Sequence, residues 1–340
     1  MRVAIYGSGA MGTVLGAFLA KNGQEVDLID SYEAHVKALN EKGAKIIGQA
    51  NFTVPVKAFT PDQLEGQYDI VFLFTKQTAN PEVLPHLKKF LHEDSVVCTL
   101  QNGIPEYSVD ELIGGNRTVG GTVLWGATFV GPGVSEVTQD VTVGDILFDI
   151  GEIDGQVTDR IKKVASVLEV MGPVTIVENL IGARWLKLIL NSAMSGMSAA
   201  LGSVFKGVLD EPKASACLSY IAAEIVEITD HLEVVLEPAM NLPMREYGLV
   251  STEEEFTRSQ SHFNTFYADK HTAKASMLQD LENGKKTEVE MINGFVVDAG
   301  AANGIETPFN STVVKIVQGI ERGELELTMD NLKYFNLPEA

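Results

Sequence analysis

Residues 1–30 read MRVAIYGSGAMGTVLGAFLAKNGQEVDLID, and they indicate the architecture of the first half of the chain. The uncharged run Val3–Tyr6 predicts a buried strand. The glycine-rich turn GSGAMG (7–12) follows it and opens a segment whose apolar residues predict a helix over Met11–Asn22. A second apolar run predicts a strand over Glu25–Ile29. This succession of strand, turn, helix and strand indicates the first unit of a parallel sheet.

The glycine-rich turn matches the pattern G-x-G-x-x-G between a strand and a helix, which is the context that dinucleotide-binding folds require. Gly7 permits the tight turn, Gly9 lets the backbone approach a pyrophosphate, and Gly12 lets the helix pack closely on the strand. The pyrophosphate would lie at the helix N-terminus, where free N–H groups and the helix dipole favour anions. The alternative is a glycine-rich turn with a purely structural role.

Asp30 ends the second predicted strand, 18 residues after Gly12. A carboxylate at this place binds both ribose hydroxyls of NAD and repels the 2′-phosphate of NADP. The following residues, Ser31-Tyr32-Glu33, supply no arginine, so the sequence favours NAD over NADP. The alternative role for Asp30 is to cap the following helix, and the two roles are compatible.

Two domains are expected from the change of pattern along the chain. The nearly continuous apolar run YDIVFLF (68–74) is typical of a parallel strand that is covered on both faces. From about residue 179 the pattern is mostly helical, with a 3.6-residue apolar period over Gly182–Leu201. We therefore predict an α/β domain with a Rossmann-type, doubly wound parallel sheet over residues 1–178. An all-helical domain is predicted over residues 179–340.

Several other patterns carry weaker expectations. The stretch Pro238–His262 is polar and acidic and contains two prolines, which predicts a surface loop or a mobile excursion of the chain. Cys98 and Cys217 lie in apolar runs and are expected to be buried, reduced thiols. The six histidines form no HExxH motif and no short-range pair, so they are expected to be surface or capping residues. No cysteine or histidine spacing predicts a metal site.

Composition restricts the classes of partner. Lys plus Arg number 26 and Asp plus Glu number 46 among 340 residues, so the formal net charge is −20. This charge opposes binding to nucleic-acid phosphates and to anionic lipid. The uncharged run Val3–Ala20 resembles a signal peptide or a short membrane span, but four glycines interrupt it and no A-x-A pattern follows. We expect no membrane segment and a cytoplasmic protein.

Five blocks of residues occur in order along nearly the whole chain. They are GSGAMG (7–12), Thr75-Lys76, Gln101-Asn102-Gly103, Trp185-x-Lys187-x-x-x-Asn191, and Ser276-Met277-Leu278-Gln279-Asp280 with Thr287-Glu288-x-x-x-Ile292-Asn293-Gly294. In this combination the chain resembles the ketopantoate reductases (2-dehydropantoate 2-reductases) and their relatives among the D-2-hydroxyacid dehydrogenases, including D-mandelate-type enzymes. The resemblance implies a Rossmann domain followed by a helical domain of the 6-phosphogluconate dehydrogenase C-terminal type. It also implies an NAD(P)-dependent reductase of a small 2-keto acid and a homodimer.

Lys187 is the candidate general acid. Reduction of a ketone needs a hydride, which a nicotinamide provides, and a proton donor for the nascent alkoxide. Lys187 lies on an apolar helix face, where desolvation makes loss of its proton easier. Asn191 is one turn further on and points to the same side, and Ser195 continues this stripe. The resemblance places a catalytic lysine at Lys187 and a substrate contact at Asn191, whereas the alternative for Lys187 is a surface lysine.

The resemblance implies roles for residues of the other blocks. Asn102, at the end of a strand, would orient the substrate beside the nicotinamide, and Lys76 would contact cofactor or substrate. Ser276 would bind the substrate carboxylate, and Glu288 would help to hold the ligand and the lysine charge. A turn position is the alternative for Asn102, and charge complementarity at a helix N-terminus is the alternative for Glu288.

The candidate site residues fall into three sets. The catalytic residues are Lys187 and Glu288. The substrate-binding residues are Asn102, Asn191, Ser195 and Ser276. The cofactor-binding residues are Gly7, Ser8, Gly9, Ala10, Met11, Gly12, Asp30, Lys76 and Asn102.

Three departures from the family pattern leave the substrate open. Asp30 stands where NADPH-dependent members usually carry a basic residue, and Ser195 stands where many members have a second asparagine. The acidic stretch 243–262 is longer than the usual family loop. The predicted function is hydride transfer to the C2 ketone of a branched 2-keto acid. The alternatives are an NAD-dependent D-2-hydroxyacid dehydrogenase for bulkier 2-keto acids and a non-catalytic dinucleotide-binding protein.

Overall fold

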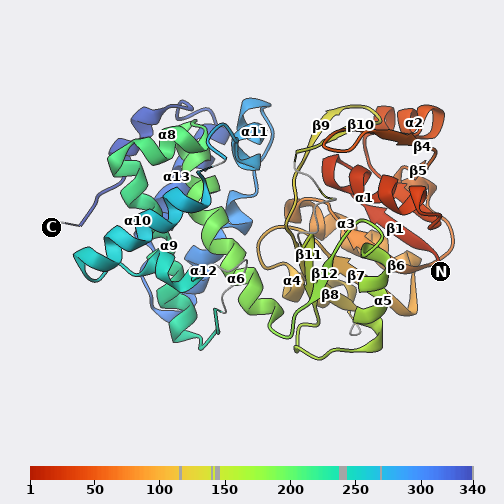
Figure 1. Ribbon diagram of the computed structural model, residues 1–340, viewed down its shortest axis with the longest axis horizontal. Helices are drawn as coiled ribbons and strands as arrows, with labels where there is room; N and C mark the ends of the chain where they lie inside the picture. Colours follow the sequence, from red (N-terminus) through yellow and green to blue (C-terminus); the bar gives the residue numbers. More distant parts are fainter. Residues whose placement is uncertain (115–116, 139–140, 142–145, 237–242, 269, 339–340) are drawn as a thin grey trace. The chain divides into compact units, whose positions relative to one another are not determined.

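The computed structural model describes the chain except for residues 115–116, 139–140, 142–145, 237–242, 269 and 339–340. The chain divides into two compact units, Met1–Leu180 and Ile181–Ala340 (Figure 1). The predicted boundary between residues 178 and 179 lies two residues before this division.

A mainly parallel sheet forms the centre of unit 1. Its strands are β1 (Val3–Tyr6), β2 (Val26–Ile29), β5 (Lys57–Phe59), β6 (Tyr68–Leu73), β7 (Leu91–Thr99), β8 (Thr118–Val123), β11 (Phe148–Gly151) and β12 (Val174–Ile176). They lie in the order β12-β11-β8-β7-β6-β1-β2-β5, and neighbours from β8 to β5 are parallel. The strand order reverses at the β1–β6 pair, so the predicted doubly wound sheet is confirmed. Sheets of this kind bind ligands beyond the carboxyl ends of the strands at such a reversal.

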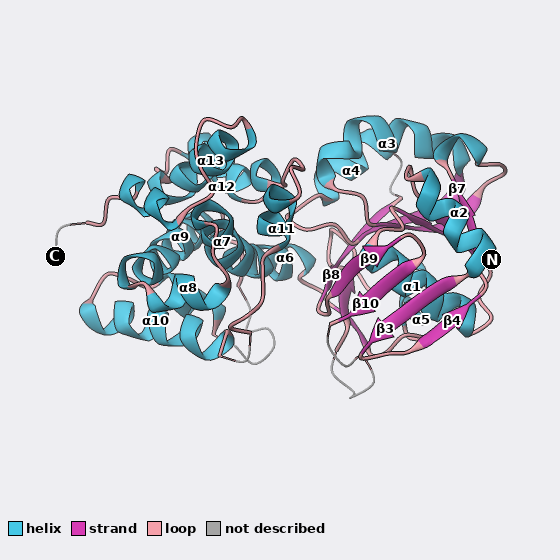
Figure 2. Cartoon of the chain, turned by 90° about the horizontal axis from the view of Figure 1, so that it is seen from above, coloured by secondary structure: helices cyan, strands magenta, loops and turns pink. Residues whose placement is uncertain are grey.

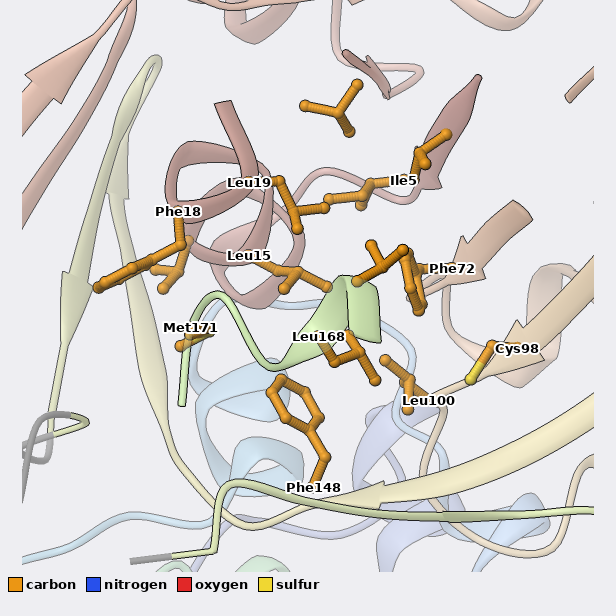
Figure 3. Close-up of a cluster of buried hydrophobic side chains, with 14 of the residues drawn as sticks. Ile5, Leu15, Phe18, Leu19, Phe72, Cys98, Leu100, Phe148, Leu168 and Met171 are labelled. Atoms are coloured by element: carbon orange, nitrogen blue, oxygen red, sulfur yellow. The ribbon is translucent and has the colours of Figure 1, made fainter. Parts of the chain in front are cut away.

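Helices cover both faces of this sheet because successive residues of its strands point to opposite faces. The helices of unit 1 are α1 (Ala10–Lys21), α2 (Glu33–Lys42), α3 (Asn80–Leu87), α4 (Glu106–Ile113) and α5 (Asp159–Leu168). Val3 and Ile5 of β1 belong to a buried cluster with Leu15 of α1 and Leu168 of α5 (Figure 3). The alternate residues of β1 belong to a second buried cluster that includes side chains of α3 and α4.

A smaller sheet packs on α1 in unit 1. Its strands are β3 (Ala44–Gly48), β4 (Phe52–Val54), β9 (Ala127–Gly131) and β10 (Val134–Val137), in the order β4-β3-β10-β9. Strands β3, β9 and β10 contact α1 (Figure 2), so this helix lies between two sheets.

Unit 2 is helical in the part of the chain that the structure describes, which confirms the predicted helical domain. Its helices are α6 (Leu180–Leu190), α7 (Gly196–Leu201), α8 (Phe205–Asp210), α9 (Pro212–His231), α10 (Glu253–Phe266), α11 (Ser276–Glu282), α12 (Asn293–Asn303) and α13 (Pro308–Glu321). A π-helical turn, Asn191–Ser195, joins α6 to α7 without a break. The long helix α9 contacts α10, α12, α13 and the π turn.

The surface loop predicted over Pro238–His262 is wrong for most of the residues that the structure describes. Residues 238–242 lie outside the description, Met244–Gly248 form a 3₁₀ turn, and α10 begins at Glu253. A capping box starts this helix: Thr252 Oγ1 accepts from the Glu255 N–H, and the Glu255 carboxylate accepts from the Thr252 N–H. The T-x-x-E pattern signals a helix start and outweighs the acidic composition.

Local features set the bounds of several elements. Helix α12 starts at Asn293, after a 3₁₀ turn over Val289–Met291. Pro55 lies between β4 and β5, where it ends the first strand because proline cannot donate to a ladder. Cys98 and Cys217 are buried, reduced thiols, as predicted.

The capping box can be tested with the substitution Thr252→Ala. Loss of the hydroxyl acceptor should lower the free energy of unfolding by about 1 kcal/mol, measured by urea denaturation. Thr257→Ala makes the same chemical change at an exposed position within α10 and should not destabilise the protein, because alanine has the higher helix propensity. Equal stability of the wild type and Thr252→Ala would show that the box does not stabilise the helix.

Candidate active site

The glycine-rich turn joins β1 to α1, and its three glycines have different surroundings. Gly7 has a φ of +96°, and a Cβ on it would lie 2.5 Å from the Thr75 nitrogen. A Cβ on Gly12 would lie 2.3 Å from the Gly7 carbonyl oxygen. Around the corresponding position on Gly9, apart from its neighbours in the chain, no atom of the described residues lies within 4 Å. Packing inside the protein therefore requires Gly7 and Gly12, whereas the open space at Gly9 fits the close approach of a phosphate.

The N-terminus of α1 is suited to an anion. Gly9 is its N-cap and provides no side-chain cap, and the first turn of the helix contains no acidic residue. The backbone N–H groups of Ala10, Met11 and Gly12 have no partner within the helix. These donors and the positive end of the helix dipole favour an anionic group. The turn therefore fits the pyrophosphate of a dinucleotide.

The carbonyl of Ser8 fixes the orientation of the turn through contacts with two buried side chains. Thr13 Oγ1 donates to the Ser8 oxygen at 2.6 Å, and His35 Nε2 lies 2.7 Å from the same oxygen. The Gly133 N–H donates to His35 Nδ1 at 2.9 Å, so the neutral Nε2–H tautomer satisfies both contacts. Because the C=O and N–H of a trans peptide point in opposite directions, an inward Ser8 carbonyl turns the Gly9 N–H outward.

The expectation of a surface or capping role is wrong for His35, which is only 1% exposed. The sequence contained a signal for this burial, because His35 lies one helical turn before Leu39 on the buried stripe of α2. Burial lowers the pKa of His35 below its ordinary value, and the Ser8 carbonyl and the Asp30 carboxylate oppose this effect. The neutral ring that the hydrogen bonds require is thus also the form that burial favours.

Asp30 directly follows β2 at the same edge of the sheet and is partly exposed. Its Oδ1 accepts from the Tyr32 N–H at 3.0 Å, which closes a turn ahead of α2. The N-cap of α2 is Tyr32, so Asp30 does not cap the helix itself. The contact with Tyr32 engages one carboxylate oxygen, and this arrangement is compatible with binding of a ribose.

Lys76 and Asn102 follow β6 and β7, and both are partly exposed. Two glutamines connect these strand ends. Gln101 Nε2 donates to the Thr75 carbonyl at 2.7 Å, and Gln77 Nε2 donates to the Asn102 carbonyl. Neither glutamine has a role that its sequence position alone indicates. The structure thus places the glycine-rich turn, Asp30, Lys76 and Asn102 at the carboxyl edge of the main sheet.

In unit 2, Lys187, Asn191 and Ser195 share one property. Between Leu186 and Gly196 they are the partly exposed positions, and the residues that separate them are buried. Lys187 lies on α6, and the other two lie on the π turn. A stripe of three polar side chains therefore lies along an otherwise buried helix.

Two other segments of unit 2 contact the π turn. Ser276 is the exposed first residue of α11, and α11 packs against the π turn and α7. Glu288 is buried at the start of the 3₁₀ turn before α12. Asn293, five residues later, donates to the Ser192 carbonyl of the π turn at 3.1 Å. The segments that carry Ser276 and Glu288 thus reach the turn that carries the polar stripe.

Comparisons with known proteins agree with both units. The family model "Ketopantoate reductase PanE/ApbA" matches residues 3–147, and the model of its C-terminal part matches residues 179–321. A 2-dehydropantoate 2-reductase from Pyrococcus abyssi is 33% identical over 324 residues, which cover 94% of this chain and 98% of the relative. This chain belongs to the ketopantoate reductase family. A relative of the same name from Pyrococcus horikoshii is 30% identical over 325 residues, with 94% and 98% covered.

Solved structures share this fold over almost the whole chain. The ternary structure of D-mandelate dehydrogenase with NADH and anilino(oxo)acetate has a TM-score of 0.81 at 22% identity, covering 95% of this chain and 99% of that one. A PanE/ApbA family ketopantoate reductase from Ralstonia eutropha JMP134 has a TM-score of 0.79 at 26% identity, with the same coverage. As a member of the family, the chain is an oxidoreductase that uses a nicotinamide cofactor.

Two general properties complete the description. Among the described residues, no helix has both the length and the apolar character that crossing a membrane requires. The expected homodimer and the expected cytoplasmic location stay predictions.

Protonation of His35 provides a test of its buried contacts. Because its folded-state pKa lies below the ordinary value of 6.5, the unfolded chain binds this proton more tightly. Above pH 6.5 the neutral ring makes its full contribution to the free energy of unfolding. This contribution is lost as the pH falls below 6.5. The free energy of unfolding of the wild type should therefore decrease more steeply with acid than that of His35→Gln, by at most about 1.4 kcal/mol per pH unit.

Urea denaturation at several pH values between about 7 and 5 measures this difference. Glutamine can still donate and accept without titrating in this range. His231→Gln, the same change at an exposed position, controls for the general loss of a histidine. Parallel curves for the wild type and His35→Gln would contradict the prediction.

Proposed function

We propose that the chain is an NAD-dependent reductase that transfers a hydride to the C2 ketone of a branched 2-keto acid. One observation carries the proposal: Lys187, Asn191 and Ser195 form a partly exposed polar stripe on a buried helix. A ketone reduction needs a proton donor and neutral hydrogen-bonding groups that hold the substrate. The phosphate-binding turn of unit 1 supports the cofactor part of the proposal.

Each candidate residue has a stated task in this reaction. When it is bound, a nicotinamide supplies the hydride. Lys187 donates a proton to the carbonyl oxygen of the substrate as negative charge develops there. Asn191 and Ser195 hydrogen-bond the substrate, and Ser276 binds its carboxylate. Glu288 helps to hold the ligand and balances the lysine charge.

The residues of unit 1 bind the cofactor and orient the substrate. The turn Gly7–Gly12 binds the pyrophosphate through its backbone, including the N–H groups of Ala10 and Met11. Asp30 binds the ribose hydroxyls and disfavours a 2′-phosphate, which supports NAD over NADP. Lys76 contacts the cofactor, and Asn102 orients the substrate.

A bulkier 2-keto acid is the second candidate substrate. Ser195 is shorter than the asparagine that many family members carry, and Asp30 suits NAD. The structurally similar D-mandelate dehydrogenase was solved with NADH and anilino(oxo)acetate, a ligand with an aromatic ring. NADH oxidation assayed in parallel with ketopantoate, 2-ketoisocaproate and benzoylformate distinguishes the two. Binding of NADH without turnover of any 2-keto acid would instead support the non-catalytic alternative.

The role of Lys187 can be tested with Lys187→Met, which keeps an unbranched apolar side chain and removes the proton donor. The kcat should fall by about 10²- to 10⁴-fold, because that is the usual contribution of a general acid. The dissociation constant of NADH should stay unchanged, because the proposed cofactor residues lie in unit 1. Lys315→Met, at an exposed position of α13, is the matched control. Unchanged kcat in Lys187→Met would exclude this lysine as the acid.

The role of Asp30 can be tested with Asp30→Asn. The asparagine oxygen can still accept from the Tyr32 N–H, so the turn is kept while the negative charge is removed. The ratio of KM for NADPH to KM for NADH should fall about tenfold, which corresponds to removal of about 1.4 kcal/mol of charge repulsion. Glu33→Gln removes a neighbouring exposed charge and should leave the ratio unchanged. If the ratio of KM for NADPH to KM for NADH is the same in Asp30→Asn and Glu33→Gln, Asp30 does not select the cofactor.

A further inference from the structure

The π turn changes the direction of the polar stripe on its helix. In an α-helix, every fourth residue advances by about 40° around the axis, so Lys187, Asn191 and Ser195 would wind away from one another. A π turn closes its hydrogen bonds over one more residue and takes more residues per revolution. Ser195 is therefore turned back toward the direction of Lys187. This agrees with the partial exposure of all three positions.

A buried amide holds this turn. Asn293 is fully buried and donates through Nδ2 to the Ser192 carbonyl of the π turn at 3.1 Å. Carbonyl groups in a π turn lose the ordinary α-helical pairing, so a donor from another element stabilises the wider turn. A Cβ on Gly196 would lie 2.9 Å from Oδ1 and 3.0 Å from Nδ2 of Asn293. The glycine after the turn thus leaves room for the amide.

Two further buried groups fix the orientation of this amide. Asn293 Nδ2 also donates to Asn310 Oδ1 at 2.9 Å. The Nδ2 group of Asn310 donates to the Glu224 carboxylate at 2.7 Å, and this carboxylate also accepts from the Phe309 and Asn310 N–H groups. Asn310 must therefore present its oxygen to Asn293, and Asn293 must present its NH₂ group to Asn310 and Ser192.

The orientation of the Asn293 amide lowers the stability of the folded protein, which points to a role beyond packing. The Oδ1 atom of Asn293 is buried, and no group of the described residues donates a hydrogen bond to it. A buried acceptor without a partner is destabilising, and such groups in native proteins call for an explanation. The contacts of Asn293 are made by its NH₂ group, which donates to the Ser192 carbonyl of the π turn and to Asn310 Oδ1.

We propose that Asn293, oriented by Asn310 and Glu224, is a positioning residue that holds the π turn and thereby aligns Asn191 and Ser195 with Lys187. The proposal rests on the proposed reduction of a 2-keto acid and extends it to residues that do not touch the substrate. It also gives a role to Asn293 within the block Ile292-Asn293-Gly294, for which the sequence reasoning found no function.

The test compares two buried asparagines that donate to the same helical segment. Asn293→Leu removes the donor to the π turn. The control is Asn331→Leu, because Asn331 Nδ2 donates to the Ala200 carbonyl of α7 at 3.0 Å, beyond the π turn. Asn331 is also buried, at 3% exposed. Both variants are expected to lose stability, so a general effect of stability is matched between them.

Two measurements are made on each full-length variant. Hydrogen–deuterium exchange of the peptide that covers residues 188–200 reports on the turn. Steady-state kinetics with NADH and ketopantoate, or whichever of the three 2-keto acids the wild type reduces, report on alignment. For Asn293→Leu we expect faster exchange in this peptide and a 10- to 100-fold lower kcat/KM for the keto acid, with unchanged NADH affinity. For Asn331→Leu we expect kcat/KM near that of the wild type.

The proposal is overturned if Asn293→Leu keeps wild-type kinetics, or if Asn331→Leu loses as much kcat/KM. If Asn293→Leu does not fold, Gly196→Ala takes its place, since the added methyl group displaces the same amide. Wild-type kinetics and exchange in Gly196→Ala would then contradict the proposal. If the wild type reduces none of the 2-keto acids, the proposed function fails. In that case, unchanged hydrogen–deuterium exchange of the peptide 188–200 in Asn293→Leu still overturns the role of Asn293 at the π turn.

Discussion

Neither Gly7 nor Gly12 has room for a Cβ, and the cofactor edge of unit 1 depends on this close packing. This packing lets α1 begin shortly after β1 and next to the residues that follow β6. No side chain of the described residues caps the first N–H groups of α1. The same packing brings the Ser8 carbonyl within reach of Thr13 and His35. Through His35 the turn is also tied to the smaller sheet. The close packing at these two glycines thus supports the contacts that connect the turn to α1, to α2 and to the smaller sheet.

The parts that the sequence predicted well are those that depend on local pattern. The order β1, α1, β2 follows from apolar runs and glycine spacing within 30 residues, and the long buried strand β6 follows from composition alone. The acidic composition of residues 243–262 misled because a capping box and buried side chains such as Met244 and Tyr247 decide the structure there. Hydrogen bonds at the start of α10 thus determined the secondary structure, whereas the acidic composition of the segment suggested a loop.

The parts that the sequence could not predict depend on partners that are distant in the chain. His35 meets Gly133 across 98 residues, and Asn293 meets Ser192 across 101 residues. No periodicity within either segment specifies these pairs. The helix over Gly182–Leu201 was predictable, but its π turn was not, because a single buried amide elsewhere in unit 2 selects the wider turn. Candidate residues were thus easier to identify from sequence than the contacts that orient them.

The π turn also shows how one residue can change the face of a helix that carries polar groups. A π turn corresponds to one residue more than a regular helix needs between the same two ends, so a single inserted codon can create it. The inserted residue rotates every side chain on one side of it relative to the other side. In this way an ordinary packing helix can acquire a polar stripe without any change in the fold around it.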